Sequence, residues 1–354
     1  MKITKLVSNI VLGRGCIREL KAFAGELLPD RSGYDVFIVD SVHRNTGTWD
    51  QLTPDSGDLM MAVDVSAHEP KTEQVDELCG RIREEKGDAL PRVVIGIGGG
   101  SAMDTAKAVS VMLTNPGSSA DYQGWDRVKE KAVPKIAVPT LAGTGAEASR
   151  TAVLSGPVRK LGINSEQSMF NGVLMDPDLL ESADPEQAFY TGMDGFIHAV
   201  EALNGSAINA MGRPFAEKSK EAIQRFFSGE GSAEELMVGS YLGGASIANS
   251  SVGVCHALSY GVSFYLGYRH GIANAIVFQR LEEFYGRDVE ALRAMALRNG
   301  IELPQDVTAG VSSATLDKMA EMAYLLERDL ISALGEDYRR ILPPERIVDL
   351  YRRM

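Results

Sequence analysis

The first 180 residues alternate strand-like and helix-like segments, and this alternation limits the possible fold more than any other feature of the sequence. Short runs rich in β-branched residues predict strands at 34–40, 59–65, 91–97 and 134–140. Residues 69–88 have helical periodicity, with a proline near the start and a glycine near the end. Strands that alternate with crossover helices form a mainly parallel sheet. We therefore predict an α/β domain over residues 1–180.

The second half has a different pattern, because long amphipathic stretches replace the strand-like runs after about residue 180. Their periodicity predicts helices over residues 214–229, 232–251 and 314–335. No linker rich in glycine, serine or proline separates the two halves, and no repeat of fixed period is present. We therefore predict an all-α domain over residues 181–354.

Composition narrows the possible partners. The 354 residues are 44% hydrophobic and 24% charged, as in ordinary globular proteins with room for two cores. The formal net charge of −12 disfavours nucleic acid as a partner. Three cysteines without a pattern fit a reducing compartment, and neither a signal peptide nor an apolar run of membrane-spanning length is present. We expect a cytoplasmic protein that binds small molecules and no membrane.

Three of the five histidines form a pattern with one aspartate that is typical of a metal site. Asp194 and His198 are four residues apart in a helical stretch, so both lie on one face and can bind the same ion. His256 and His270 follow in another apolar stretch. Each histidine alone could equally be a hydrogen-bonded core residue, but an unpaired imidazole in apolar surroundings is costly. One carboxylate and three imidazoles suit Fe²⁺ or Zn²⁺.

A glycine-rich segment follows the clearest predicted strand and opens a helix. Free backbone N–H groups and the positive end of a helix dipole at such a turn suit a phosphate. The segment departs from the usual dinucleotide-binding spacing, so a tight turn without a ligand is an alternative. A second loop rich in glycine and threonine, at 139–149, also follows a strand, and two such loops favour a bound nucleotide. The predicted phosphate cradle consists of Gly98, Gly99, Gly100 and Ser101.

Together these motifs resemble the iron-containing, or group III, alcohol dehydrogenase family, which includes glycerol dehydrogenases and is related in fold to dehydroquinate synthases. The family's GGGSxxDxxK loop matches residues 98–107, and its TxxGTGSE loop is similar to residues 140–147 with Ala146 in place of serine. Its Asp-x-x-x-His pair matches residues 194–198, and its later histidines match His256 and His270. The resemblance covers essentially the whole chain.

The resemblance implies an N-terminal domain that binds NAD and a C-terminal domain that binds the metal. The metal would bind the alcohol oxygen, and a hydride would pass to the nicotinamide. An acidic Asp40 at a strand end implies NAD rather than NADP, although aspartate is also common in turns. A homodimer is expected. The implied cofactor contacts are Asp40, Gly98, Gly99, Gly100, Ser101, Asp104, Thr140, Gly143, Thr144 and Lys160.

Two departures from the family pattern indicate an unusual alcohol. Tyr260 stands one helical turn after His256, where many members have a further catalytic histidine, so Tyr260 is a candidate catalytic residue that could donate a hydrogen bond. Arg269 and Arg150 could bind an anionic group, although each could instead form a salt bridge. With these departures, the chain resembles family members that oxidise the C8 hydroxyl of 3-deoxy-manno-octulosonate, an acidic sugar of lipopolysaccharide. Dioxygen could be the electron acceptor of that reaction.

Other functions fit parts of the pattern. A general NAD-dependent alcohol or glycerol dehydrogenase needs the same metal ligands and loops. A carbocyclase similar to dehydroquinate synthase would use NAD and a metal without net reduction of the cofactor. A metal-dependent hydrolase would need no nicotinamide, so NAD binding separates it from the dehydrogenase.

Overall fold

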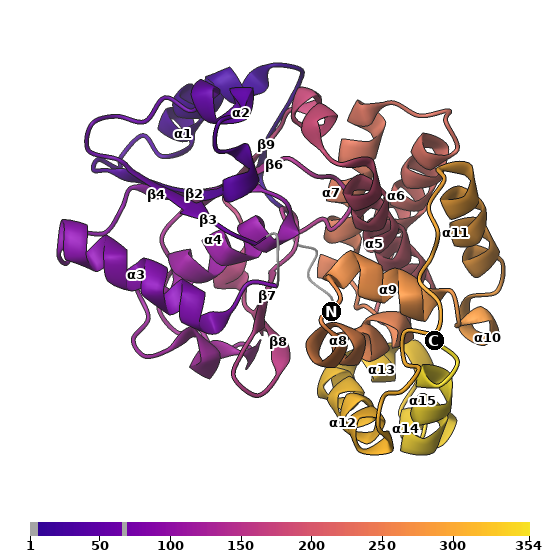
Figure 1. Ribbon diagram of the computed structural model, residues 1–354. Coiled ribbons are helices and arrows are strands. Elements are labelled where there is room, and N and C mark those ends of the chain that lie inside the picture. Colours follow the sequence, from indigo (N-terminus) through magenta and orange to yellow (C-terminus); the bar gives the residue numbers. More distant parts are fainter. Residues whose placement is uncertain (1–5, 66–68) are drawn as a thin grey trace. The chain divides into compact units, whose positions relative to one another are not determined.

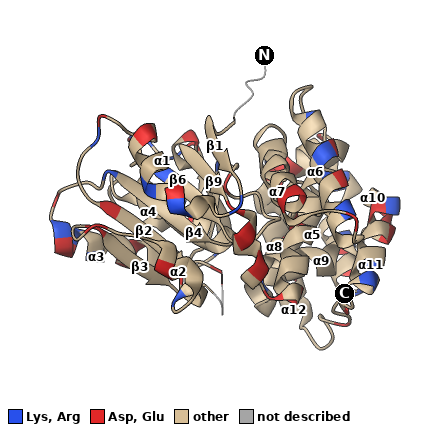
Figure 2. Cartoon of the chain, turned by 90° about the horizontal axis from the view of Figure 1, so that it is seen from above, with Lys and Arg blue, Asp and Glu red and all other residues tan. Residues whose placement is uncertain are grey.

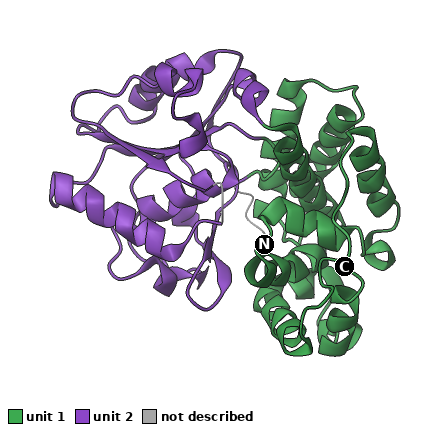
Figure 3. Ribbon diagram, viewed as in Figure 1, with its two compact units in different colours: residues 1–5, 142–145, 184–354 green, residues 6–141, 146–183 purple. Residues whose placement is uncertain are grey.

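The computed structural model describes residues 6–65 and 69–354 (Figure 1). One of the five histidines, His68, lies outside the described residues. Contacts divide the described residues into two compact units, one made of residues 6–141 and 146–183 and the other of residues 142–145 and 184–354 (Figure 3). We call them the α/β unit and the helical unit. The predicted domains, residues 1–180 and 181–354, stay a prediction, because compact units do not show which parts of the chain fold independently.

The α/β unit is built on two sheets. Its larger sheet has six strands in the order β1-β9-β6-β4-β2-β3, and every pair in it is parallel (Figure 1). The four predicted strands are confirmed as β2, β3, β4 and β6. The strands are β1 (Asn9–Leu12), β2 (Asp35–Asp40), β3 (Leu59–Val63), β4 (Val93–Gly98), β5 (Gly124–Trp125), β6 (Lys135–Pro139), β7 (Thr151–Ser155), β8 (Lys160–Asn164) and β9 (Gly172–Met175).

Helices cover both faces of the larger sheet. Val36 and Ile38 of β2 belong to an apolar cluster with residues of α3 and α4, whereas Phe37 and Val39 belong to a cluster with residues of α1. Because both faces are covered, all six residues of β2 are buried, and its four central residues form a continuous apolar run. The helices are α1 (Leu20–Leu27), α2 (Gly47–Gln51), α3 (Thr72–Lys86) and α4 (Gly100–Met112). The crossover helix predicted over 69–88 is confirmed as α3.

The smaller sheet was not expected from the sequence. It has the order β5-β8-β7, with β7 and β8 antiparallel. Its strands have two to five residues, so each is too short to give a strong periodic signal.

The helical unit contains helices and no strand among residues 184–354, as predicted. One prediction is wrong in detail: residues 314–335 form two helices rather than one, separated by a 3-10 turn at Tyr324–Leu326. The backbone of Leu326 (φ −95°, ψ 41°) leaves the α region, although no glycine or proline marks the break. The helices are α5 (Pro185–Asn204), α6 (Gly212–Phe227), α7 (Ala233–Ala248), α8 (Val254–Leu266), α9 (His270–Phe278), α10 (Glu282–Tyr285), α11 (Arg287–Arg298), α12 (Ser313–Ala323), α13 (Glu327–Leu334), α14 (Tyr338–Ile341) and α15 (Pro344–Tyr351).

Acidic and basic residues are interspersed over the helices and loops of each unit (Figure 2). Within residues 6–65 and 69–354, no helix has the combined length and apolar character that crossing a bilayer requires.

Candidate metal centre and nucleotide loops

The four predicted metal ligands come together inside the helical unit. Asp194 and His198 lie one turn apart on α5, His256 lies on α8, and His270 is the first residue of α9. Asp194, His198 and His256 are buried, and His270 is partly exposed. The sequence therefore brings three separate helices to one point in the core.

The donor atoms of these residues converge on one carboxylate oxygen. Asp194 Oδ1 lies 3.2 Å from His256 Nε2, and 3.7 Å from both His198 Nε2 and His270 Nε2. Ligand atoms of Asp194, His256 and His270 all lie within 4.8 Å of one another. Asp194 Oδ2 and His198 Nδ1 are buried without a hydrogen-bond partner. A buried carboxylate with an unused oxygen, facing three imidazoles, suits a divalent cation.

The electrostatics of the cluster also favour a cation. Burial opposes charge on Asp194, but the three imidazoles outweigh this effect and hold the pKa of its carboxyl well below the usual range. Burial lowers the pKa of His198 to about 4. Burial also opposes charge on His256, yet Glu201 and Asp194 overcome it and raise the pKa of that imidazole to about 9. Asp194 and Glu201 thus place negative charge at both nitrogens of the His256 ring.

Sequence reasoning missed two buried polar residues that contact this cluster. Glu201 Oε2 lies 2.5 Å from His256 Nδ1. Asn274 Nδ2 donates to Asp194 Oδ1 at 2.6 Å and lies 3.1 Å from His256 Nε2. Both stand at helical spacing from predicted ligands, three residues after His198 and four after His270. The spacing was visible, but glutamate and asparagine are too common in helices to be selected by it.

The structure also places the predicted catalytic tyrosine and the two arginines predicted to bind substrate. Tyr260 is buried on α8, and its ring meets that of His270 edge to face at 6.1 Å between centroids. Arg269 is exposed and donates a hydrogen bond to Gln187. Arg150, in the α/β unit, places its guanidinium 4.8 Å from the centre of the Trp125 ring. Neither arginine forms an ion pair within residues 6–65 and 69–354. Their roles stay predictions.

The first glycine loop lies at the carboxyl edge of the larger sheet. Strands β2, β4 and β6 are neighbours, so Asp40, Gly98 and Thr140 lie at the same edge. The chain leaves β2 toward β3 and leaves β4 toward β6, which makes this edge a topological switch point. A Cβ at Gly98 would lie 2.8 Å from the Cβ of Asp40, so glycine is required there. The next residues form the N-terminus of α4.

Two polar side chains at this edge already have protein partners. Asp40 accepts a hydrogen bond from the backbone of Val42, as in an ordinary turn. His43 is buried, and its Nε2 lies 2.8 Å from Thr140 Oγ1.

Two predicted cofactor residues, Asp104 and Lys160, have protein partners inside the α/β unit, as does Lys107. Asp104 accepts from the backbone N–H of Val153 at 3.0 Å, and Lys107 donates to the carbonyl of Thr151 at 2.7 Å, so both tie α4 to β7. Burial raises the pKa of Asp104 to about 6. Lys160 is fully buried, and its Nζ lies 3.3 Å from Glu69. Contacts from Asp104 or Lys160 to a cofactor stay predictions.

The second glycine loop packs against helices of the helical unit. The backbone N–H groups of Gly143 and Gly145 donate to Ser240 Oγ on α7 at 2.7 and 3.3 Å. A Cβ at Gly143 would lie 1.8 Å from the carbonyl oxygen of Thr191 on α5. Close helix packing therefore accounts for these glycines without a ligand. Contacts from Gly143 and Thr144 to a cofactor stay predictions.

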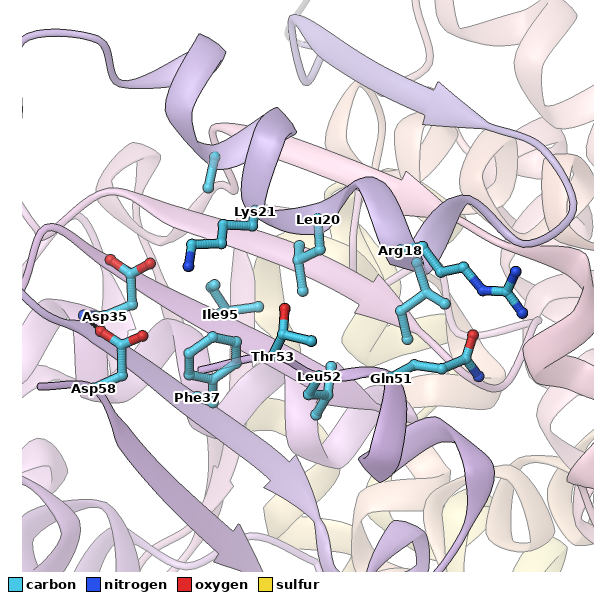
Figure 4. Close-up of a pocket in the computed structure, with 12 residues that line it drawn as sticks. Arg18, Leu20, Lys21, Asp35, Phe37, Gln51, Leu52, Thr53, Asp58 and Ile95 are labelled. Carbon is cyan, nitrogen blue, oxygen red and sulfur yellow. Dashed lines mark hydrogen bonds between the residues drawn. The ribbon is translucent and has the colours of Figure 1, made fainter. Parts of the chain in front are cut away.

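A separate small hollow lies beside α1 in the α/β unit (Figure 4). Its lining includes Arg18, Lys21, Asp35 and Leu52. Lys21 forms an ion pair with Asp55, and Asp35 begins β2, whereas the glycine loop follows the opposite end of the neighbouring strand β4. None of the predicted site residues lines the hollow.

Comparison with models of protein families shows which family this chain belongs to. The model of iron-containing alcohol dehydrogenases matches residues 8–177, and that of the C-terminal region of the same family matches residues 188–329. The chain belongs to the iron-containing alcohol dehydrogenase family. It is therefore an oxidoreductase that acts on alcohols, as the resemblance implied.

Curated relatives in this family have several substrates. Alcohol dehydrogenase 4 of Schizosaccharomyces pombe is 26% identical over 88% of this chain and 74% of its own length. The NAD-dependent methanol dehydrogenase of Bacillus methanolicus is 27% identical over 75% of this chain and 71% of its own. The 4-hydroxybutyrate dehydrogenase of Cupriavidus necator is 28% identical over 84% of each chain. None of these names supports the narrower prediction of an acidic-sugar oxidase.

Several solved structures have a similar fold. The alcohol dehydrogenase of Oenococcus oeni superposes with a TM-score of 0.85 over 99% of both chains at 21% identity. A sulfoacetaldehyde reductase of Bifidobacterium kashiwanohense, solved with NAD⁺, gives 0.80 over 99% of this chain and 98% of its own at 20% identity. Together these matches support the fold predicted from the sequence, a parallel-sheet α/β domain followed by a helical domain.

Proposed function

We propose that this protein is a metal-dependent dehydrogenase that interconverts a primary alcohol and its aldehyde with NAD. The observation that carries the proposal is the convergence of Asp194, His198, His256 and His270 in the core of the helical unit. A hydrolase would need only such a metal site, but the family of this chain acts on alcohols. The general dehydrogenase is therefore better supported than the sugar oxidase, the carbocyclase or the hydrolase.

The four side chains would hold Fe²⁺ or Zn²⁺. Such a cation, when bound, polarises a substrate oxygen and lowers the pKa of the hydroxyl. Asp194 supplies the negative charge of the ligand set, and its position between three Nε2 atoms orients the donors before any substrate arrives. Tyr260, against the His270 ring, is placed to donate a hydrogen bond where many family members have a histidine.

The α/β unit would bind NAD at the carboxyl edge of its larger sheet. The N-terminus of α4 offers backbone N–H groups to the pyrophosphate, and the absence of side chains at 98–100 lets the backbone approach it. Asp40, across from Gly98, would accept from the adenosine ribose and repel the 2′-phosphate of NADP.

The test is metal analysis of anaerobically purified protein, followed by an alcohol panel with NAD or NADP in which NADH absorbance and oxygen uptake are both recorded. We expect one divalent metal per chain, loss of activity with a chelator, and faster reduction of NAD than of NADP. Oxygen uptake without NADH would favour the oxidase. Product formation with neither signal would favour a carbocyclase, and absence of NAD binding would favour a hydrolase.

We further infer that the alcohol carries an anionic group. Arg269 precedes His270 directly, and the only hydrogen-bond partner of its guanidinium in the described chain is the neutral amide of Gln187. Its charge is therefore available to a substrate. A 4-hydroxybutyrate dehydrogenase is among the relatives, and a sulfoacetaldehyde reductase has the same fold. Both names indicate a short substrate with an anion at the far end. An acidic sugar has the same chemistry, but short substrates have the better support.

Replacing Arg269 with glutamine is expected to raise KM for 4-hydroxybutyrate about tenfold or more and to leave that for 1-butanol unchanged, because a charge-assisted contact contributes ~1.5–3 kcal/mol. Steady-state kinetics on the two alcohols measures the difference. Arg280, which also pairs with a glutamine, provides the matched control Arg280→Gln. Equal changes in KM for both alcohols would contradict the inference.

We also propose that the enzyme is cytoplasmic. The three cysteines form no disulfide with one another, which fits a cytoplasmic enzyme. A homodimer remains a proposal from the family.

A further inference from the structure

We propose that Glu201 is a positioning residue that holds His256 as a metal ligand and balances the charge of the cation. The proposal rests on the metal site proposed above. It adds a residue that is not itself among the ligands.

Four donors fix the carboxylate of Glu201, which is fully buried on α5. Its Oε2 lies 2.5 Å from His256 Nδ1 and accepts from the N–H of Gly253 at 2.8 Å. Its Oε1 accepts from the N–H of Cys255 at 2.6 Å and from the hydroxyl of Tyr285 at 2.8 Å. Two of these donors belong to the backbone just before His256. Glu201 therefore fixes both the start of α8 and the imidazole that follows.

These contacts determine which ring nitrogen faces the ion. A carboxylate only accepts hydrogen bonds, so Nδ1 of His256 must carry a proton. In the neutral ring, Nε2 then keeps its lone pair, and this atom lies 3.2 Å from Asp194 Oδ1. A carboxylate behind a ligating histidine orients the ring and makes it a stronger donor. His198 differs, because its Nδ1 is buried without a partner.

Charge balance gives an independent argument. Three neutral imidazoles and Asp194 carry one negative charge, so a bound divalent ion would leave one positive charge in a buried site. A net charge in a low-dielectric core is costly. Glu201, at 1% exposure, supplies the second negative charge in contact with the ligand set.

The substitution Glu201→Gln tests the proposal, because it keeps the shape of the side chain and removes the charge. Metal affinity is measured with Co²⁺ by competition against a chelator, and the absorption of bound Co²⁺ reports the ligand geometry. We expect the dissociation constant to rise about 10- to 100-fold, with an altered Co²⁺ spectrum. The matched control Tyr285→Phe removes one hydrogen bond to the same carboxylate and keeps its charge, so its effect is expected to be smaller.

The outcomes separate this proposal from the one on which it rests. If wild-type protein binds no Co²⁺, Zn²⁺ or Fe²⁺, both are wrong. If the wild type binds Co²⁺ and Glu201→Gln binds it equally tightly, only the role of Glu201 is wrong, even if the metal-free variant unfolds at a lower temperature. Should Glu201→Gln fail to fold, Glu201→Asp shortens the side chain away from His256. Wild-type affinity in that variant would also overturn the proposal.

Discussion

Replacing Asp194 with alanine is expected to remove the bound metal and to lower kcat/KM for alcohol oxidation by about 1,000-fold or more. A Lewis-acid cation stabilises developing oxygen charge by several kcal/mol, and each ~1.4 kcal/mol corresponds to tenfold in rate. Asp194 is the only carboxylate whose oxygen lies within 4 Å of all three Nε2 atoms in the described chain. Without it, none of the described carboxylates would lie among the three Nε2 atoms, because Glu201 contacts His256 at Nδ1.

Metal content by mass spectrometry and kinetics on the best alcohol measure this effect. Asp349 offers a matched control, because it is an exposed aspartate whose ion pair with Arg352 lies on the surface. Asp349→Ala should keep full metal content and rate. A variant Asp194→Ala that retained both would show that the cluster does not hold the catalytic metal.

The α/β architecture could be predicted because its signals are local. The centre of a strand such as β2, buried on both faces, is an unbroken apolar run. A proline precedes α3 and a glycine follows it. The smaller sheet and the break at Leu326 could not be predicted in the same way. Strands of two to five residues have no measurable period, and the helix break is a backbone change without a sequence marker.

The clustering of the candidate metal ligands could be predicted because histidine is rare in this chain, with five in 354 residues. Asp194 and His198 at helical spacing, followed by His256 and His270 in one apolar stretch, therefore formed a recognisable pattern. Glu201 and Asn274 could not be selected, because their importance depends on the approach of α5, α8 and α9 in space. The second glycine loop shows the opposite difficulty. Its glycines suggested a nucleotide, whereas helix packing is sufficient to require them.

That packing leads to the other large expected effect, for Gly244→Ala on α7. A Cβ at Gly244 would lie 1.9 Å from the carbonyl oxygen of Gly145 and 2.7 Å from its Cα. These are backbone atoms, and the N–H of Gly145 is bonded to Ser240 on the same helix, so neither side can yield easily. We expect the free energy of unfolding to fall by about 3 kcal/mol, at the upper end for overpacking. Chemical unfolding followed by circular dichroism measures it.

The same clash should reach the metal centre, because residues 142–145 lie between α7 and α5. The position for a Cβ at Gly195 is 2.2 Å from the carbonyl oxygen of Gly143, and Gly195 directly follows Asp194. A displaced loop would therefore move the helix that carries two ligands, and Co²⁺ affinity should fall with stability. Gly80→Ala on α3 is the matched control, since no atom lies within 4 Å of its Cβ position. Alanine there should stabilise the protein by ~0.5–1 kcal/mol. Unchanged stability in Gly244→Ala would mean that the loop does not pack tightly against α7 in solution.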